Sequence, residues 1–238
     1  MGGKILKFEL EGTMACFKKY YSNKNVLSYY IPPRTVIIGM LASILGLKKD
    51  SYYKVFSSEN INISLKIKDE SKKYVTPMNH LKSGGGRRQV RHEFLIPKNN
   101  KISFIIYLYF KSFKYKDLLI KKIKDKELGY GISLGQSQFK GYIKNEAIFN
   151  SFKIIDNYKG EISTITSIKN IIEINNLEEN TLIKDIFPLN FKEIKKGREP
   201  FKYKNILYEK SGRNLYGEFN KVIKVDNRYI SFFDNGDL

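Results

Sequence analysis

The sequence predicts an α+β protein, with an open sheet and two helices in residues 1–150 and a small, mostly β domain in residues 151–238. Two observations support this prediction. Segments in which apolar and polar residues alternate, as in half-buried strands, are interrupted by two segments with the period of an α-helix. Beyond about Phe152 only short strand-like runs remain, separated by turn signals.

The sequence signals that predict the first strand and the first helix are strong. Lys4–Leu10 alternates, so we expect a strand with one buried face. The polar, tyrosine-rich segment that follows, Gly12–Tyr30, is too long for a simple connection. Pro32 and Pro33 open an apolar segment of helical period that Gly46 closes, as proline suits the start of a helix and glycine its end. Gly39 costs this helix about 1 kcal/mol relative to alanine, so we expect it to pack closely on the sheet.

The remaining predicted strands and the second helix complete an order of elements that is known from other domains. Ile61–Lys68 alternates as a strand, and Ile102–Phe110 is an apolar run typical of a central strand. Tyr115–Lys126 is an amphipathic helix that turns three apolar residues, including Leu118, inward and five lysines outward. A glycine-rich loop and a fourth strand follow in residues 129–149. Strand, helix, strand, strand, helix, strand is the order of ferredoxin-like domains, which include the RRM-like frame of RNA-recognition motifs.

A long basic segment connects the second and third strands of this order. Ser71–His92 contains six lysines and arginines, two histidines and no acidic residue, with Gly84–Gly86 near its middle. Because strand-like runs lie on both sides, we predict an extended hairpin over about residues 71–97 that projects from the sheet and has a flexible tip. Such a shape suits the binding of a polyanion.

The overall charge indicates the same class of partner. The chain has 43 Lys and Arg against 24 Asp and Glu, a formal net charge of +19. Nucleic acid is the leading candidate, because each phosphate that is neutralised releases counterions. A membrane surface and a purely solubilising charge are the alternatives. The first residues lack the apolar stretch of a signal peptide and no apolar run could span a bilayer, so we expect a cytoplasmic protein.

Few residues are candidates for chemistry. The single cysteine, Cys16, excludes an internal disulfide, and we expect it to be a small buried residue. His80 and His92 could serve a metal-independent ribonuclease together with a tyrosine and a lysine. Histidines that only flank or contact a phosphate backbone are the favoured interpretation. No spacing of carboxylates indicates a metal-dependent nuclease. We therefore predict no catalytic residue, no metal and no cofactor.

Two loops are candidates for contacts with single-stranded RNA. Phe17–Tyr30 interleaves tyrosines with lysines, so that rings can stack on bases while ammonium groups hold phosphates. Tyrosines that pack against the sheet are an equally weighted alternative. Gly129–Gly135 lacks the ending of a phosphate-binding loop, and a structural turn is favoured over a close approach of its backbone to a partner. Residues 161–190 carry five acidic residues and two lysines, so we do not expect them to face nucleic acid.

The first 145 residues also resemble a known family. Gly12, the segment Ala15–Lys18, Tyr29 and IPPRTVIIGMLASILG closely resemble the opening of CRISPR-associated family five. LKKDSYYKVFSSENINISLKI and GISLGQSQFKGYI are similar to it as well, most of all to its type I-B branch. That family supplies the subunit that caps the 5′ handle of the guide RNA (crRNA) in Cascade complexes. The resemblance implies that the basic hairpin is a thumb, which inserts into the guide RNA near the handle–spacer junction.

The resemblance also implies which residues bind RNA. Handle contacts come from the loop after the first strand and the start of the first helix, thumb contacts from the hairpin, and weaker contacts from a turn in the glycine-rich loop. By the resemblance these residues are Lys18, Lys19, Ser22, Asn23 and Arg34 for the handle, Arg87, Arg88 and Arg91 in the thumb, and Gln136 and Ser137 in the turn. The residue pattern alone adds Tyr20 and Tyr29 on the loop and His80 and His92 on the hairpin as candidate RNA contacts. For Arg34, capping of a local turn is the alternative.

The function implied is that of a non-catalytic Cascade subunit in antiviral defence. It would bind the crRNA handle, nucleate assembly with the backbone and large subunits, and meet target DNA only through the complex; no membrane partner is expected. The type I-C branch of the family cleaves precursor RNA with a Tyr-Lys-His set, and this sequence has no clear Lys-His pair in an equivalent place. The alternatives are a metal-independent endoribonuclease that processes precursor crRNA through His80 or His92, and a generic basic RNA-binding scaffold.

Overall fold

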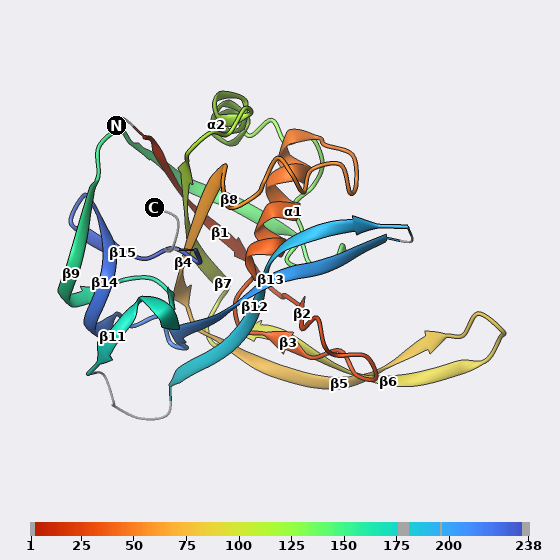
Figure 1. Cartoon of the computed structure of the whole chain (residues 1–238). Helices are drawn as coiled ribbons and strands as arrows, with labels where there is room; N and C mark the ends of the chain where they lie inside the picture. The colour runs from red at the N-terminus through yellow and green to blue at the C-terminus, as the bar shows by residue number, and fades with distance from the viewer. Residues whose placement is uncertain (1–2, 176–180, 196, 235–238) are drawn as a thin grey trace.

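The computed structural model describes residues 3–175, 181–195 and 197–234, and it is mostly β, with two α-helices in this part of the chain (Figure 1). Its centre is a four-stranded antiparallel sheet in the order β4-β7-β1-β8. The sheet and its helices are β1 (Ile5–Gly12), α1 (Arg34–Leu45), β4 (Ile61–Asp69), β7 (Ile102–Phe110), α2 (Lys116–Asp125) and β8 (Gly141–Phe149). Each of these elements lies within a few residues of its predicted position. None of the described helices is long and apolar enough to cross a membrane.

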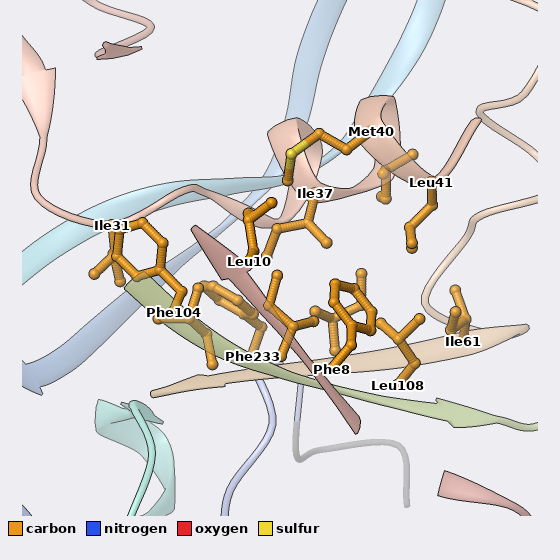
Figure 2. Packing of buried hydrophobic residues seen from close by; sticks show 14 of the residues in the cluster. Phe8, Leu10, Ile31, Ile37, Met40, Leu41, Ile61, Phe104, Leu108 and Phe233 are labelled. Atoms are coloured by element: carbon orange, nitrogen blue, oxygen red, sulfur yellow. The ribbon is translucent and has the colours of Figure 1, made fainter. Parts of the chain in front are cut away.

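The core lies between the central sheet and α1. Figure 2 shows Ile37, Met40 and Leu41 of the helix above Phe8 and Leu10 of β1, and all five side chains are buried. The alternation predicted for β1 places its apolar side chains on this face of the sheet, where their burial is the main source of stability. The same cluster includes apolar residues from the second part of the chain, namely Ile165, Phe187, Leu189, Ile206, Tyr208 and Phe233.

Two expectations about the helices are wrong. Gly46 ends α1 in the left-handed conformation (φ 71°), as predicted, but Gly39 does not pack on the sheet. A Cβ atom at Gly39 would meet only the hydroxyl of Tyr52, at 3.6 Å. Leu118 of α2 is 44% exposed, and Ile120 is buried in its place. The inward face of α2 is therefore rotated from the predicted one.

The expectation that β1 has only one buried face is also wrong. A second sheet covers its other face, so that Ile5 packs with Phe232. Glu9 is buried on β1 as well; it accepts hydrogen bonds from Lys68 (2.7 Å) and Ser103 (2.8 Å). The second sheet consists of β9 (Lys153–Ile162), β11 (Ile171–Ile174), β14 (Leu215–Val225) and β15 (Arg228–Ile230), and a short 3₁₀ helix (Ile168–Asn170) precedes β11.

The basic segment forms the predicted hairpin, which we call the first hairpin. Its strands β5 (Ser71–Leu81) and β6 (Arg87–Pro97) pair along their whole length in a two-stranded sheet of their own. At the tip the backbone N–H of Lys82 donates to the carbonyl of Gly86 (3.1 Å). Gly85 and Gly86 have φ values of 85° and 81°, which glycine adopts without strain.

A second hairpin was not predicted. β12 (Leu182–Ile194) and β13 (Gly197–Glu209) pair as two 13-residue strands, and the short β10 (Thr166–Ser167) pairs with β13. Pro188 and Pro200 lie inside these strands, and proline weakens the sequence signal of a strand because it cannot donate to the ladder. Both hairpins project from the same side of the molecule, and the short strands β2 (Phe17–Lys18) and β3 (Ser28–Tyr29) lie between their bases (Figure 1).

Candidate nucleic-acid interface

The loop between β1 and α1 is attached to the first hairpin by backbone hydrogen bonds. The N–H of Val26 donates to the carbonyl of Arg91 (2.9 Å), and the N–H of Glu93 donates to Val26 (2.8 Å). Ala15 and Leu95 exchange two further bonds of 3.0 and 2.7 Å. The loop expected to bind the handle and the hairpin expected to act as a thumb therefore form one continuous surface.

The same loop is attached to the second hairpin by side chains. Lys19 forms an ion pair with Asp185 (2.7 Å), and the Tyr29 hydroxyl donates to a backbone carbonyl of β12 (2.7 Å). Burial favours a lower pKa for Lys19, but the hydrogen bonds with Asp185 and Tyr21 and the charge of Asp185 together outweigh this effect, and the pKa is raised. The ring of Tyr20 lies 4.9 Å from that of Tyr203. Lys19 and Tyr29 are thus engaged within the protein.

Arg34 is fully buried, which does not fit the expectation that it contacts RNA. Its guanidinium donates to the carbonyls of Phe56 (3.0 Å), Ile61 (2.8 Å) and Leu189 (2.9 Å) and to the side chain of Asn190 (2.8 Å). Burial lowers the pKa of Arg34 to about 10, so the group remains charged at neutral pH. Arg34 joins the start of α1 to β4 and β12, and it presents no surface to a ligand.

Most of the other predicted residues are accessible, on three neighbouring segments. Ser22 is an exception: it is buried, and its hydroxyl donates to the carbonyl of Lys19 (2.8 Å). Gln136 is half-buried. The exposed residues are Lys18, Tyr20 and Asn23 on the loop, His80, Arg87, Arg88 and Arg91 on the first hairpin, and Ser137 on the turn.

The two histidines come together on the first hairpin. Their Nε2 atoms lie 2.7 Å apart and their rings are stacked, with centroids separated by 4.9 Å. His92 is buried, and its Nδ1 has no hydrogen-bond partner among the described residues. Burial, followed by the positive charges of His80 and Lys18, lowers the pKa of His92. His92 is therefore held in its neutral form near pH 7.

Acidification is expected to weaken the hairpin at this pair. Because the pKa of His92 is lowered in the folded protein, the unfolded chain binds more protons in the window just below the ordinary value of 6.5. Neutral His92 therefore contributes its full stability to the folded protein above pH 6.5. This contribution is lost as the pH falls through the lowered pKa of His92. An NMR titration should show that His80→Gln moves the pKa of His92 upward. An unchanged value would contradict a direct interaction between the two rings.

Cys16 is buried, as predicted, and burial raises the pKa of its thiol to about 11. Since the thiolate is the reactive form, we expect alkylation of the native protein at mildly alkaline pH to be slow, and alkylation of the denatured protein to be fast. Mass spectrometry after a timed reaction with iodoacetamide measures both. Rapid modification of the native protein would contradict this burial.

The described residues contain no group of three or more His, Cys, Asp or Glu side chains that could hold a metal ion.

A groove of about 550 Å³ opens beside this surface, between α1, the glycine-rich loop and the second hairpin. Phe191 and Arg198, on the second hairpin, line it, and neither was predicted from the sequence. The segment 191–204 interleaves basic and aromatic residues, which is the pattern that singled out Phe17–Tyr30, so this signal was present in the sequence. The groove is also lined by Lys18, Tyr20, Gly39, Ser43, Tyr52, Gly131 and Gly135.

Comparisons with known proteins agree with the resemblance in the first part of the chain. The family model described as CRISPR-associated protein (Cas_Cas5) matches residues 5–99. The fold is similar to that of a CRISPR protein from Archaeoglobus fulgidus, with 13% identity, coverage of 95% of this chain and 98% of that chain, and a TM-score of 0.59. It is also similar to a chain of a CRISPR RNA-guided surveillance complex, with 14% identity, coverage of 91% and 90%, and a TM-score of 0.54. Comparison with curated proteins gives no significant match.

Proposed function

We propose that this protein is a non-catalytic subunit of a type I CRISPR effector complex that binds and caps the 5′ handle of crRNA. The observation that supports it most directly is the backbone attachment of the β1–α1 loop to the first hairpin through Val26, Arg91 and Glu93. The segment matched by the Cas_Cas5 family model, residues 5–99, includes both parts of this surface. The strand order β4-β7-β1-β8 supports a ferredoxin-like description of the core.

The charges on this surface favour RNA. Arg87, Arg88 and Arg91 are exposed on the first hairpin, and no acidic residue occurs between Ser71 and His92. The two flanking carboxylates, Glu70 and Glu93, are paired with Lys98 and Lys73, at 2.8 Å each. Arginine suits phosphate oxygens because its planar guanidinium can donate two hydrogen bonds to one group. The exposed rings of the loop add surfaces on which bases can stack.

The proposal includes the finer expectations drawn from the sequence. The protein belongs to the type I-B branch, acts in the cytoplasm, and nucleates assembly with the backbone and large subunits of Cascade. It meets target DNA only through that complex. Because Asn23, Gln136 and Ser137 carry polar side chains on the same surface, they are available for contacts with base edges.

The test compares the affinity of the purified protein for the 5′ handle with that for a scrambled RNA of equal length. At physiological salt we expect the handle to bind about tenfold more tightly or better, since each base-edge contact contributes about 1–3 kcal/mol. RNA that co-purifies from the native host should have a uniform 5′ end. Equal affinities together with heterogeneous bound RNA would identify a generic scaffold instead.

An endoribonuclease is the second candidate, and the pairing of His80 with His92 is the observation that favours it. Cleavage needs a base that takes the proton of a 2′-hydroxyl and an acid that protonates the leaving oxygen. The contact between the two Nε2 atoms (2.7 Å) occupies one nitrogen of each ring, and the Nδ1 atom of His92 is buried, so we favour the non-catalytic function. Cleavage of repeat RNA in the presence of a chelator, abolished by His92→Ala, would establish the enzyme.

A further inference from the structure

The groove between α1 and the second hairpin has the composition of a nucleotide site. Its described lining contains two cationic side chains, Lys18 and Arg198, and no carboxylate. Three of its aromatic residues, Tyr20, Tyr52 and Phe191, come from three different segments. Cations that hold a phosphate and rings on which a base can lie are the two components of single-strand binding. The volume of about 550 Å³ falls within the range of small-ligand pockets, about 300–1,000 Å³.

The packing of the protein gives no reason for a glycine at position 39. It lies in the interior of α1, where glycine is less favourable than alanine, and it faces the groove. Its position needs no glycine for packing, since a Cβ atom would only contact the Tyr52 hydroxyl at an ordinary 3.6 Å. Gly135 differs, because a Cβ atom there would clash with the carbonyl of Cys16. At Gly39 the missing side chain instead gives a ligand room against the helix backbone.

The second hairpin holds a cation at the rim of this space. The Arg198 guanidinium stacks on the ring of Phe191, with its Cζ atom 4.7 Å from the ring centroid. Its Nη1 lies 3.9 Å from Asp50, which does not line the groove. These contacts orient a side chain that is still 44% exposed, so that it remains accessible to a phosphate.

We propose, on the basis of the RNA-binding function above, that the groove holds one unstacked nucleotide of single-stranded RNA. Its base lies against Phe191 and the backbone of α1 at Gly39, and its phosphate lies between Lys18 and Arg198. The second hairpin is thereby a second RNA-binding arm, distinct from the first hairpin. This assigns an RNA contact to a part of the chain whose acidic first half, residues 161–190, predicts the opposite.

Filling the groove is the direct test, and Gly39 allows it without removing any contact. Gly39→Leu places a larger side chain in the groove on a residue that favours helix, and Gly39→Ala is the matched control. We expect Gly39→Leu to weaken handle binding about tenfold, in line with the loss of one stacked base, and Gly39→Ala to bind like the wild type. Thermal unfolding of both variants establishes that they are folded.

Two further variants test the arm without relying on Gly39. Arg198→Gln should weaken binding several-fold, whereas Lys192→Gln, an equal change of charge on an exposed residue of the same hairpin that does not line the groove, should have little effect. In a scan of handle RNAs that each lack one base, we expect one position whose loss weakens the wild type but not Phe191→Ala. The absence of such a position would overturn the proposal.

The outcomes separate this proposal from the function on which it rests. A wild-type protein that binds handle and scrambled RNA equally contradicts handle recognition itself. A wild-type protein that prefers the handle, with Gly39→Leu and Arg198→Gln unchanged, contradicts only the nucleotide groove. If Gly39→Leu keeps its RNA affinity but fails to join the other complex subunits, the groove holds a protein segment and the proposal is overturned. Should Gly39→Leu not fold, Arg198→Gln and the base scan decide.

Discussion

Replacing Arg34 with methionine is expected to lower the free energy of unfolding by about 3–5 kcal/mol, because several buried acceptors lose their donor at once. Three of these acceptors are backbone carbonyls, of Phe56, Ile61 and Leu189, and the burial of Arg34 keeps water from replacing it. Methionine fills a similar space but donates no hydrogen bond. Urea unfolding followed by circular dichroism measures the change.

Arg87→Met is the matched control for this substitution. Arg87 is exposed near the tip of the first hairpin, so its loss should change the free energy of unfolding by less than about 0.5 kcal/mol. Arg34→Lys should fall between the two, since one ammonium group cannot reach acceptors on both β4 and β12. If the Arg34→Met protein has unchanged stability but no longer binds the handle, Arg34 contacts RNA as the sequence predicted.

Changing Arg87, Arg88 and Arg91 together to glutamine is expected to weaken handle binding roughly fifty-fold at physiological salt. Each neutralised phosphate of a single strand contributes about 0.7 to the slope of log affinity against log salt, so this slope should fall by about 2. Fluorescence anisotropy at several salt concentrations gives both values. The free energy of unfolding should stay the same, because all three side chains are exposed.

The control for this triple variant is a triple variant at α2, which is separate from the first hairpin. Lys114, Lys121 and Lys124 lie on or beside α2 and are exposed, and their change to glutamine alters the net charge by the same amount. We expect a much smaller loss of affinity and no change in the salt slope. If both triple variants weaken binding equally, the protein attracts RNA through its overall charge, and the first hairpin is no specific contact.

The sequence was sufficient for the elements that local signals define. Alternation located β1 and β4, and the glycines near Gly85 located the tip of the first hairpin, because a left-handed turn needs glycine there. Most of the residues that carry the family resemblance lie within the segment 5–99 that a family model matches, whereas GISLGQSQFKGYI lies beyond it. These features depend on residues close together in the chain.

The features that the sequence did not reveal depend on distant residues. Lys19 and Arg34 looked like surface cations, and both are fixed by β12, more than 150 residues later in the chain. β12 itself was hidden because Pro188 interrupts the strand pattern. The second buried face of β1 was not predicted for the same reason, since β14 and β15, which cover Ile5, come from the far end of the sequence. The local sequence shows which side chains are apolar or charged, but it does not show which distant elements of the chain cover them.

The attachment of the β1–α1 loop to Asp185 has a consequence for the order in which the protein matures on the ribosome. Lys19 and Tyr29 are synthesised long before the strand that receives them, which begins at Leu182. During translation this loop can dock on the first hairpin but not yet on the second. Its final geometry is therefore set only when most of the chain has emerged, so the proposed handle site would be complete only near the end of synthesis.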